Sequence, residues 1–221
     1  LGGHFDSRTV NSGDVTGFAP GADDDGSAVA ALLEIARLLA GQPLAATVVP
    51  AAFAGEEQGL NGSSAYADSL HDANASVTAM INMDMIGHIV DPFGVVDTTT
   101  IRCFSGDPMG SSSRQLARYV KWVGESYSGG LTVALQPLLD RPGRGSDHIS
   151  FYNDGYPACR LIESAEDVAY QHGPNDLPAN MSFSYTRKAA RLALGAATVL
   201  ASAPPAPQAP SVVSLGDGGG F

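Results

Sequence analysis

Apolar and polar residues follow two kinds of pattern along this chain. In five segments a short apolar run, rich in Val, Ile, Thr, Ala and Phe, is bounded by glycine, proline or polar residues. Runs of this length and composition predict strands buried in a sheet. The predicted strands are residues 47–54, 77–83, 98–104, 131–136 and 156–162.

Between the apolar runs, apolar residues recur every three or four positions, which is the period of a helix. In residues 27–40 they are Ala28, Leu32, Ile35 and Leu39, with Ser27 as the expected cap and Gly41 as the expected stop. The other predicted helices are residues 61–70, 111–127, 146–152 and 184–201. Alternating strands and helices predict an α/β fold with a mixed, largely parallel β-sheet sandwiched between helices.

Length and composition favour one domain followed by a tail. At 221 residues and 44% hydrophobic content the chain can bury a substantial core, which we assign to residues 1–202. Residues 203–221 are rich in proline and glycine, a composition typical of an extended linker or tail.

Charge and hydropathy exclude several kinds of partner. The net charge is −11 with only 12 Lys and Arg, so nucleic acid and anionic membrane surfaces are not expected partners. No apolar run reaches the roughly 20 residues of a transmembrane helix. Cys103 and Cys159 both lie in predicted strands, where a disulfide and two buried thiols remain equal alternatives.

Acidic residues stand where predicted strands and helices meet. Glu56 and Glu57 follow the strand 47–54, at the end where open α/β sheets bind ligands. The adjacent Asp23, Asp24 and Asp25 would repel one another strongly without a cation, which favours a metal bound by the middle one. The sequence therefore indicates a cation site near these strand ends.

Further candidate ligands follow other apolar runs. Asp84 ends the strand 77–83, where an aspartate is seldom left unpaired, and histidines stand at positions 4 and 172. Two imidazoles with three carboxylates form a ligand set that suits a pair of zinc ions. Asp6 stands two residues after His4, where its carboxylate could accept the second ring N–H of the imidazole.

Five segments in this order resemble the di-zinc aminopeptidase family: residues 3–6, 21–27, 53–59, 82–87 and 170–176. This family contains bacterial leucyl aminopeptidase-like zinc exopeptidases and is related to glutamate carboxypeptidases, glutaminyl cyclases and transferrin receptor ectodomains. The resemblance implies the zinc-exopeptidase architecture and two Zn²⁺ per chain. One ion would be held by His4 and Asp84, the other by Glu57 and His172, with Asp24 as the bridging carboxylate.

The resemblance also implies roles around the metals. Glu56 matches the general base that takes a proton from a zinc-bridging hydroxide or water, and Met85 resembles a specificity-pocket residue. Asp147, in the triplet 146–148, matches a residue that supports the ligands from behind. A Ser/His/Asp hydrolase is rejected, because triad members are usually distant in sequence and no Gly-x-Ser-x-Gly motif is present.

Two departures from the family pattern affect the substrate site. Family members have strands and helices before the His4 motif, so we expect a missing N-terminal segment or a partner polypeptide that supplies it. The family's oxyanion-stabilising tyrosine is absent from residues 141–145, and Tyr170 is the candidate replacement. Arg141 or Arg144 could instead bind a substrate carboxylate through its forked guanidinium.

The resulting expectation is a zinc-dependent aminopeptidase that removes N-terminal, apolar residues from peptides. Glu56 and Asp84 would recognise the free α-amine of the substrate. A carboxypeptidase or dipeptidase is the first alternative, supported by the two arginines; a glutaminyl cyclase and a non-catalytic receptor-like ectodomain are weaker alternatives. The family and the proline-rich tail favour a secreted or periplasmic location.

Overall fold

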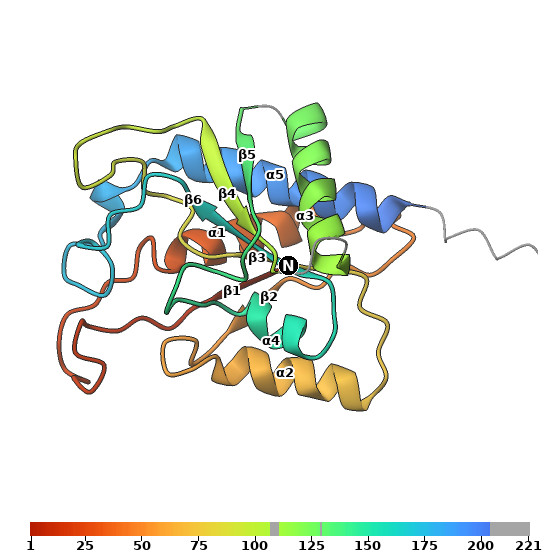
Figure 1. The fold of residues 1–221 in the computed structure, drawn as a ribbon, viewed down its shortest axis with the longest axis horizontal. Coiled ribbons are helices and arrows are strands. Elements are labelled where there is room, and N and C mark those ends of the chain that lie inside the picture. Colours follow the sequence, from red (N-terminus) through yellow and green to blue (C-terminus); the bar gives the residue numbers. More distant parts are fainter. Residues whose placement is uncertain (107–110, 129, 204–221) are drawn as a thin grey trace, which may run out of the picture.

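A computed structural model of the chain describes residues 1–106, 111–128 and 130–203, so most of the expected tail lies outside the described residues. Six strands form one sheet in the order β2-β1-β3-β6-β4-β5 (Figure 1). Neighbouring strands run parallel except β4 and β6, which are antiparallel. The strands are β1 (Gly2–His4), β2 (Ala51–Phe53), β3 (Met80–Met83), β4 (Thr100–Phe104), β5 (Thr132–Gln136) and β6 (Ala158–Glu163).

Helices cover both faces of the sheet, as the sequence predicts. The larger core joins the sheet to α1, α3 and α5, and a smaller core joins it to α2 and α4 (Figure 1). The helices are α1 (Gly26–Leu39), α2 (Asn61–Asp72), α3 (Ser112–Val123), α4 (His148–Asn153) and α5 (Phe183–Ser202). The predicted α/β architecture is therefore confirmed.

Side chains of β6 point alternately to the two cores, because successive residues of a strand face opposite sides of the sheet. Cys159 and Leu161 belong to the larger core, whereas Ala158 belongs to the smaller one. Arg160 therefore lies on the α4 side of the sheet, and only 2% of its surface is exposed. A buried arginine inside a central strand requires partners of opposite charge.

The start of α1 differs from the sequence-based expectation. Asp25, not Ser27, is the cap: its side chain accepts a hydrogen bond from the backbone N–H of Ala28. The Ser27 hydroxyl instead donates to the carbonyl of Asp23. Gly41 follows the helix with a positive φ of 76°, which suits its expected role as a stop.

Cys103 and Cys159 are free and completely buried, so the structure selects two thiols over the disulfide. Within the described residues, no helix combines the length and the apolar character that crossing a membrane requires.

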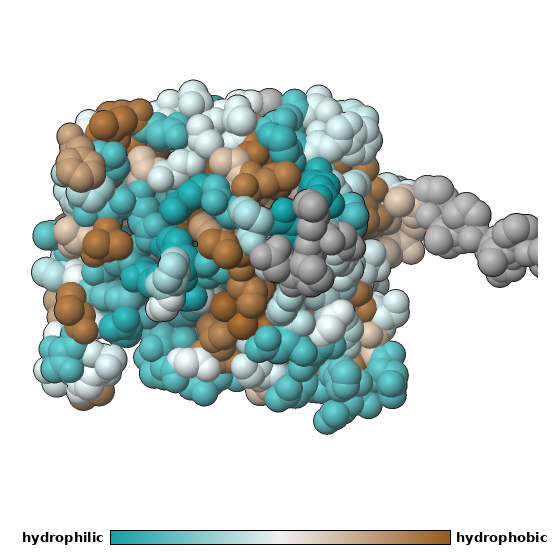
Figure 2. Space-filling model, in the orientation of Figure 1, coloured by the Kyte–Doolittle hydropathy of each residue, from teal (hydrophilic) through white to brown (hydrophobic). Residues whose placement is uncertain are grey.

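Loops leaving the carboxyl ends of β1 and β3 carry exposed apolar side chains. Phe5 and Phe18 lie after β1, and Phe93 and Val95 lie between β3 and β4; each has more than 60% of its surface exposed. The brown patch at the upper left of Figure 2 lies over the loop between β3 and β4. Apolar side chains are therefore exposed on two loops at this edge of the sheet.

Candidate metal centre

Most residues of the candidate site lie where parallel strands end. His4 is the last residue of β1, Asp84 follows β3 directly, and Glu56 and Glu57 follow β2 after a two-residue turn. In the β1–β2 pair His4 lies opposite Phe53, which brings the ends of these strands to one edge of the sheet. The carboxyl edge of such a sheet is where α/β proteins bind ligands.

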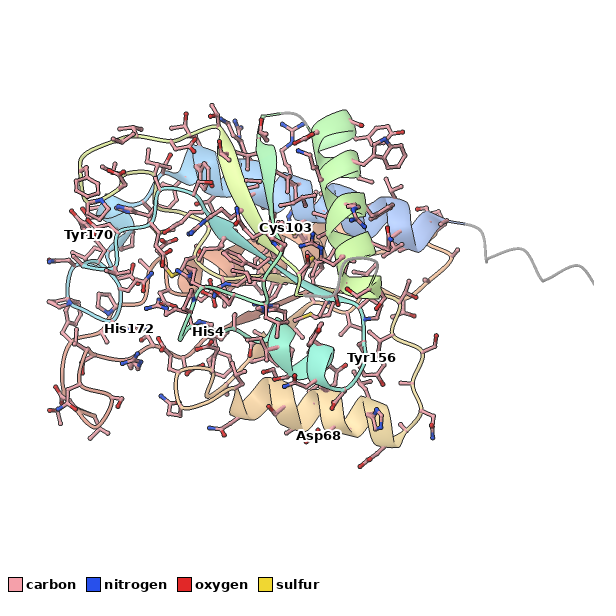
Figure 3. The ribbon with its side chains drawn as sticks, viewed as in Figure 1. His4, Asp68, Cys103, Tyr156, Tyr170 and His172 are labelled. Atoms are coloured by element: carbon pink, nitrogen blue, oxygen red, sulfur yellow. The ribbon has the colours of Figure 1, made fainter. Side chains whose placement is uncertain are left out.

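Asp24 lies between the two histidines and faces both. Its Oδ1 is 3.2 Å from Nε2 of His4, and its Oδ2 is 3.1 Å from Nε2 of His172. The same nitrogen of His172 is 3.2 Å from Oε2 of Glu57, and that of His4 is 3.9 Å from Oδ2 of Asp84. Figure 3 shows His172 on the loop side of the site and His4 on the sheet side.

The potential ligand atoms form two compact groups. Within each group all of them lie within 4.8 Å of one another: His4, Glu56 and Asp84 in the first, Asp24, Glu57 and His172 in the second. The five sequence-predicted ligands are thus brought together. Glu56, predicted as the general base, lies inside the first group rather than beside it.

These residues fit zinc. Each group joins one imidazole nitrogen to carboxylate oxygens, the donor set that zinc favours. Oε1 of Glu57 is buried and accepts no hydrogen bond from any residue that the structure describes. Hydrogen bonds to Asp24 and Glu57 raise the pKa of His172 to about 9. A buried carboxylate oxygen without a hydrogen bond and an imidazole with a raised pKa both mark places where positive charge is stabilised.

Asp6 supports the site differently from the expectation. The backbone carbonyl of Asp6, at 3.0 Å, accepts the Nδ1 proton of His4, while its carboxylate is 3.6 Å away. That carboxylate instead accepts the backbone N–H groups of Glu56 and Glu57, each at 3.2 Å. One residue therefore fixes both the imidazole tautomer and the turn that carries the two glutamates.

Two aspartates to which the sequence analysis assigned no role in the site, Asp25 and Asp176, hold the Asp24 segment. Asp176 accepts hydrogen bonds from the backbone N–H of Asp23 at 2.7 Å and of Asp24 at 3.0 Å. Asp25 accepts from the backbone N–H of His4 at 3.0 Å and of Met85 at 3.2 Å. Sequence reasoning could have found Asp25 as the residue before a predicted helix and Asp176 as a member of the segment 170–176, but neither position indicates these contacts with the backbone.

A cavity of about 360 Å³ opens in front of the two groups, and Glu56 lines it together with Met85 and Arg144. Burial, followed by repulsion from Asp84, raises the pKa of Glu56 to about 8. Met85 and His172 have positive φ angles of 62° and 57°. Such angles are costly for residues other than glycine and cluster at functional sites.

Tyr170 lies outside this cavity. Its ring packs against that of His88 at a centroid distance of 4.8 Å, beside a much smaller cavity that Met85 and Asp24 also line. Figure 3 shows Tyr170 apart from His172, on the side away from His4. Its expected role at an oxyanion stays a prediction.

The two candidate arginines differ in their surroundings. Arg141 pairs with Asp140 at 3.0 Å and with Glu166, and it does not line the cavity. Arg144 lines the cavity and donates to the side chain of Gln171. Arg8, which the sequence analysis missed, also lines the cavity, and its Nε donates to Oε2 of Glu57 at 2.7 Å.

The triplet 146–148 lies behind Asp84. Ser146 donates to Oδ2 of Asp84 and accepts from Nδ2 of Asn82 at 2.7 Å. Asp147 is completely buried, and this burial raises its pKa to about 6. His148 points elsewhere, since its Nε2 donates to the carbonyl of Leu139 at 2.7 Å. Within this triplet, the hydrogen bond to the candidate metal ligand Asp84 therefore comes from Ser146.

Comparison with known proteins finds a family match over most of the chain. The model of peptidase family M28 matches residues 1–197. A "Probable zinc metalloprotease" of Pyrenophora tritici-repentis is 36% identical over 233 residues, covering 93% of this chain and 54% of its own length. The chain spans about half the length of the curated relatives that it matches.

Solved structures with the same fold include two aminopeptidases. That of Legionella pneumophila, LapA, has a TM-score of 0.69 and 25% identity, covering 91% of this chain and 51% of that one. The aminopeptidase of Aneurinibacillus sp. strain AM-1 has a TM-score of 0.69 and 28% identity, covering 92% of this chain and 43% of that one.

Proposed function

The chain belongs to peptidase family M28, and from this premise we propose that it is a zinc metallopeptidase that removes N-terminal residues from peptides. One observation carries the proposal: the two oxygens of Asp24 face His4 and His172 at 3.2 and 3.1 Å. A carboxylate between two imidazoles suits a ligand shared by two ions, which need an anion between them to offset their repulsion. We therefore assign two Zn²⁺ to the site.

Five residues would hold the ions: His4 and Asp84 for one, Glu57 and His172 for the other, with Asp24 between them. When bound, zinc supplies Lewis-acid polarisation of the scissile carbonyl and makes water a stronger acid. Glu56 accepts the proton of the attacking water and passes it to the leaving amine, because it is the one carboxylate of the two groups not needed as a ligand.

The shape and charge of the site support an exopeptidase that selects a free α-amine. The cavity of about 360 Å³ is lined by four carboxylates: Asp24, Glu56, Glu57 and Asp84. Excess negative charge at the end of a cavity stabilises a substrate ammonium group. Exposed Phe5 and Phe93, on loops leaving the same edge, support a preference for apolar peptides.

A dipeptidase or carboxypeptidase is the second candidate, and Arg144 is the observation that favours it. This arginine lines the cavity, with 34% of its side chain exposed. A guanidinium in this position can bind a substrate carboxylate with two parallel hydrogen bonds. We rank this candidate second because Gln171 and Glu166 already surround Arg144.

The test is the release of p-nitroaniline from leucine p-nitroanilide by the purified chain. We expect cleavage that a chelator abolishes and added Zn²⁺ restores, with no cleavage of the N-acetylated substrate. The dipeptidase or carboxypeptidase is tested by comparing the cleavage rate of a dipeptide that has a free carboxylate with that of its amide.

Equal cleavage of the free and the N-acetylated substrate would reject recognition of the α-amine. Preference for the dipeptide over its amide, lost in Arg144→Gln, would replace the aminopeptidase with the dipeptidase. No cleavage of any of these substrates by a chain with two bound Zn²⁺ would refute both.

A further inference from the structure

The buried guanidinium of Arg160 contacts the carboxylate of Asp84 directly. Nη2 of Arg160 is 3.1 Å from Oδ1 of Asp84, and 2% and 4% of the two side chains are exposed. The other oxygen, Oδ2, faces His4 and accepts the hydroxyl proton of Ser146. The two oxygens of Asp84 are therefore not equivalent.

Arg160 is itself held from behind. Its Nη1 donates to Oδ2 of Asp140 at 2.6 Å and to the carbonyl of Gly145 at 2.9 Å. Asp140 in turn accepts from the backbone N–H of Arg141 at 2.7 Å and from its Nε at 3.0 Å. Asp84, Arg160 and Asp140 thus form a buried row of alternating charge, which we name the Arg160 row.

Stability alone is a weak explanation for this row. Removing charges from water costs about as much as their attraction returns, so buried ion pairs often contribute little net stability. The row does fix the orientation of its carboxylates, because a planar guanidinium held at two carboxylates sets the orientation of both. A carboxylate held at one oxygen presents the other oxygen for coordination.

From this geometry we propose that Arg160 is a positioning residue that holds Oδ1 of Asp84, so that Asp84 binds metal through Oδ2 alone. The proposal rests on the two-zinc site of the proposed function. It also assigns the substrate amine chiefly to Glu56, because the charge of Asp84 is already compensated by Arg160. Nothing in the motif around Asp84 indicates this contact, which spans 76 residues of sequence.

The experiment titrates the metal-free chain with Zn²⁺ in competition with a chromogenic chelator and records the visible spectrum of the Co²⁺ form. Arg160→Lys keeps the charge but not the fork, Arg160→Met removes both, and Asp140→Asn loosens the support behind Arg160. Arg37→Lys is the matched control, because Arg37 makes a two-nitrogen pair with Glu34 at the exposed surface.

We expect Arg160→Lys and Arg160→Met to weaken one of the two Zn²⁺ sites by about 10- to 100-fold and to change the Co²⁺ bands. Asp140→Asn should shift both readouts in the same direction by less, and Arg37→Lys should shift neither. Far-UV circular dichroism identifies variants that fold. If both Arg160 variants fail to fold, Asp140→Asn decides, and unchanged affinity and spectrum in that variant reject the proposal.

Two results separate the proposal from the function on which it rests. Two Zn²⁺ bound by the parent and by every variant with equal affinity would reject the role of Arg160 and leave the peptidase intact. Parent-like affinity in Arg160→Lys with tighter binding in Arg160→Met would show that the arginine acts by charge alone, which also rejects positioning. A parent chain that binds no Zn²⁺ overturns both.

Discussion

Glu56 combines a half-buried carboxylate with an open cavity in front of it. We expect Glu56→Gln to lower kcat by about 10²- to 10⁴-fold, the usual contribution of a general acid–base residue. The chain should keep two Zn²⁺, because the five proposed ligands are untouched. Steady-state kinetics together with metal analysis measure both quantities.

The control for Glu56 is Glu34→Gln, which makes the same change at an exposed residue of α1 and should leave kcat unchanged. Loss of one Zn²⁺ from Glu56→Gln would contradict its assignment as the base and make it a ligand. The proximity of Glu56 to His4 and Asp84 makes this the decisive measurement.

His148 gives the stability of the molecule a further dependence on pH. Burial lowers the pKa of His148 from 6.5 to about 4, while its Nε2–H bonds the carbonyl of Leu139. Between these values the unfolded chain binds a proton that the folded chain does not, so the free energy of unfolding falls as pH falls. The full loss is on the order of 3 kcal/mol, complete near pH 4.

In His148→Gln the amide can still donate to Leu139, and the decline between pH 6.5 and 4 should be shallower than in the parent. Urea unfolding at a series of pH values measures this slope in both proteins. His71→Gln, a change at an exposed histidine of α2, is the control and should follow the parent curve. Identical slopes for His148→Gln and the parent would contradict the assignment.

At the scale of single residues, what the sequence predicts depends on distance along the chain. His4, Asp24, Glu57, Asp84 and His172 each stand in a short local motif and were predicted as one set, which the structure brings together. Local motifs carry no information on contacts such as those of Arg8 with Glu57 or Arg160 with Asp84. These depend on which strands become neighbours.

At the scale of the elements, the sequence predicted whether a segment is a helix or a strand more reliably than it predicted where that element begins and ends. The apolar run 47–54 yields only Ala51–Phe53 as β2, because Pro50 has no N–H to donate to the sheet. Pro157 has the same effect before β6, which begins at Ala158. A proline lacks a donor for the ladder of backbone hydrogen bonds, so a strand tends to begin after it although the apolar run starts earlier.

The turn between β2 and α2, which carries Glu56 and Glu57, depends on Gly62. A Cβ at this position would lie 2.5 Å from the carbonyl oxygen and 2.8 Å from the nitrogen of Ala54, and its own N–H bonds that carbonyl. Backbone atoms cannot move aside cheaply. We expect Gly62→Ala to lower the free energy of unfolding by about 1–3 kcal/mol, measured by urea denaturation.

Asp68→Ala is the control for Gly62, because it introduces alanine at an exposed position of the same helix. It should change the free energy of unfolding by less than about 0.5 kcal/mol. Equal stability of Gly62→Ala and the parent would show that α2 can shift away from Ala54.

Across the whole molecule, alternation of strands and helices predicted the layers but not the strand order. The antiparallel pairing of β4 with β6 leaves no mark in the sequence, since a buried strand has the same composition in either direction. The candidate site was nevertheless predictable, because the parallel strands β1, β2 and β3 end at one edge whatever their order.

Metal removal should destabilise the whole molecule. Carboxylates gathered at the site repel one another without cations, and a ligand that binds only the folded chain stabilises it by about 2.7 kcal/mol at 100 times its Kd. We expect a chelator to lower the melting temperature by roughly 5 to 10 °C, measured by scanning calorimetry.

We expect Zn²⁺ but not Mg²⁺ to restore the melting temperature, because the imidazole nitrogens of the site suit zinc better than magnesium. The control is His172→Gln, which should respond less to the chelator than the parent does. An unchanged melting temperature in the parent would contradict a metal centre that contributes to stability.

Cys103 and Cys159 supply the molecule with an intrinsic reporter. They are the only two cysteines of the chain, and both are free and completely sealed inside the larger core. A thiol reagent in solution reaches them only when the sheet and its helices separate. The rate at which two equivalents of reagent are consumed therefore follows the opening of the core, without any label being introduced.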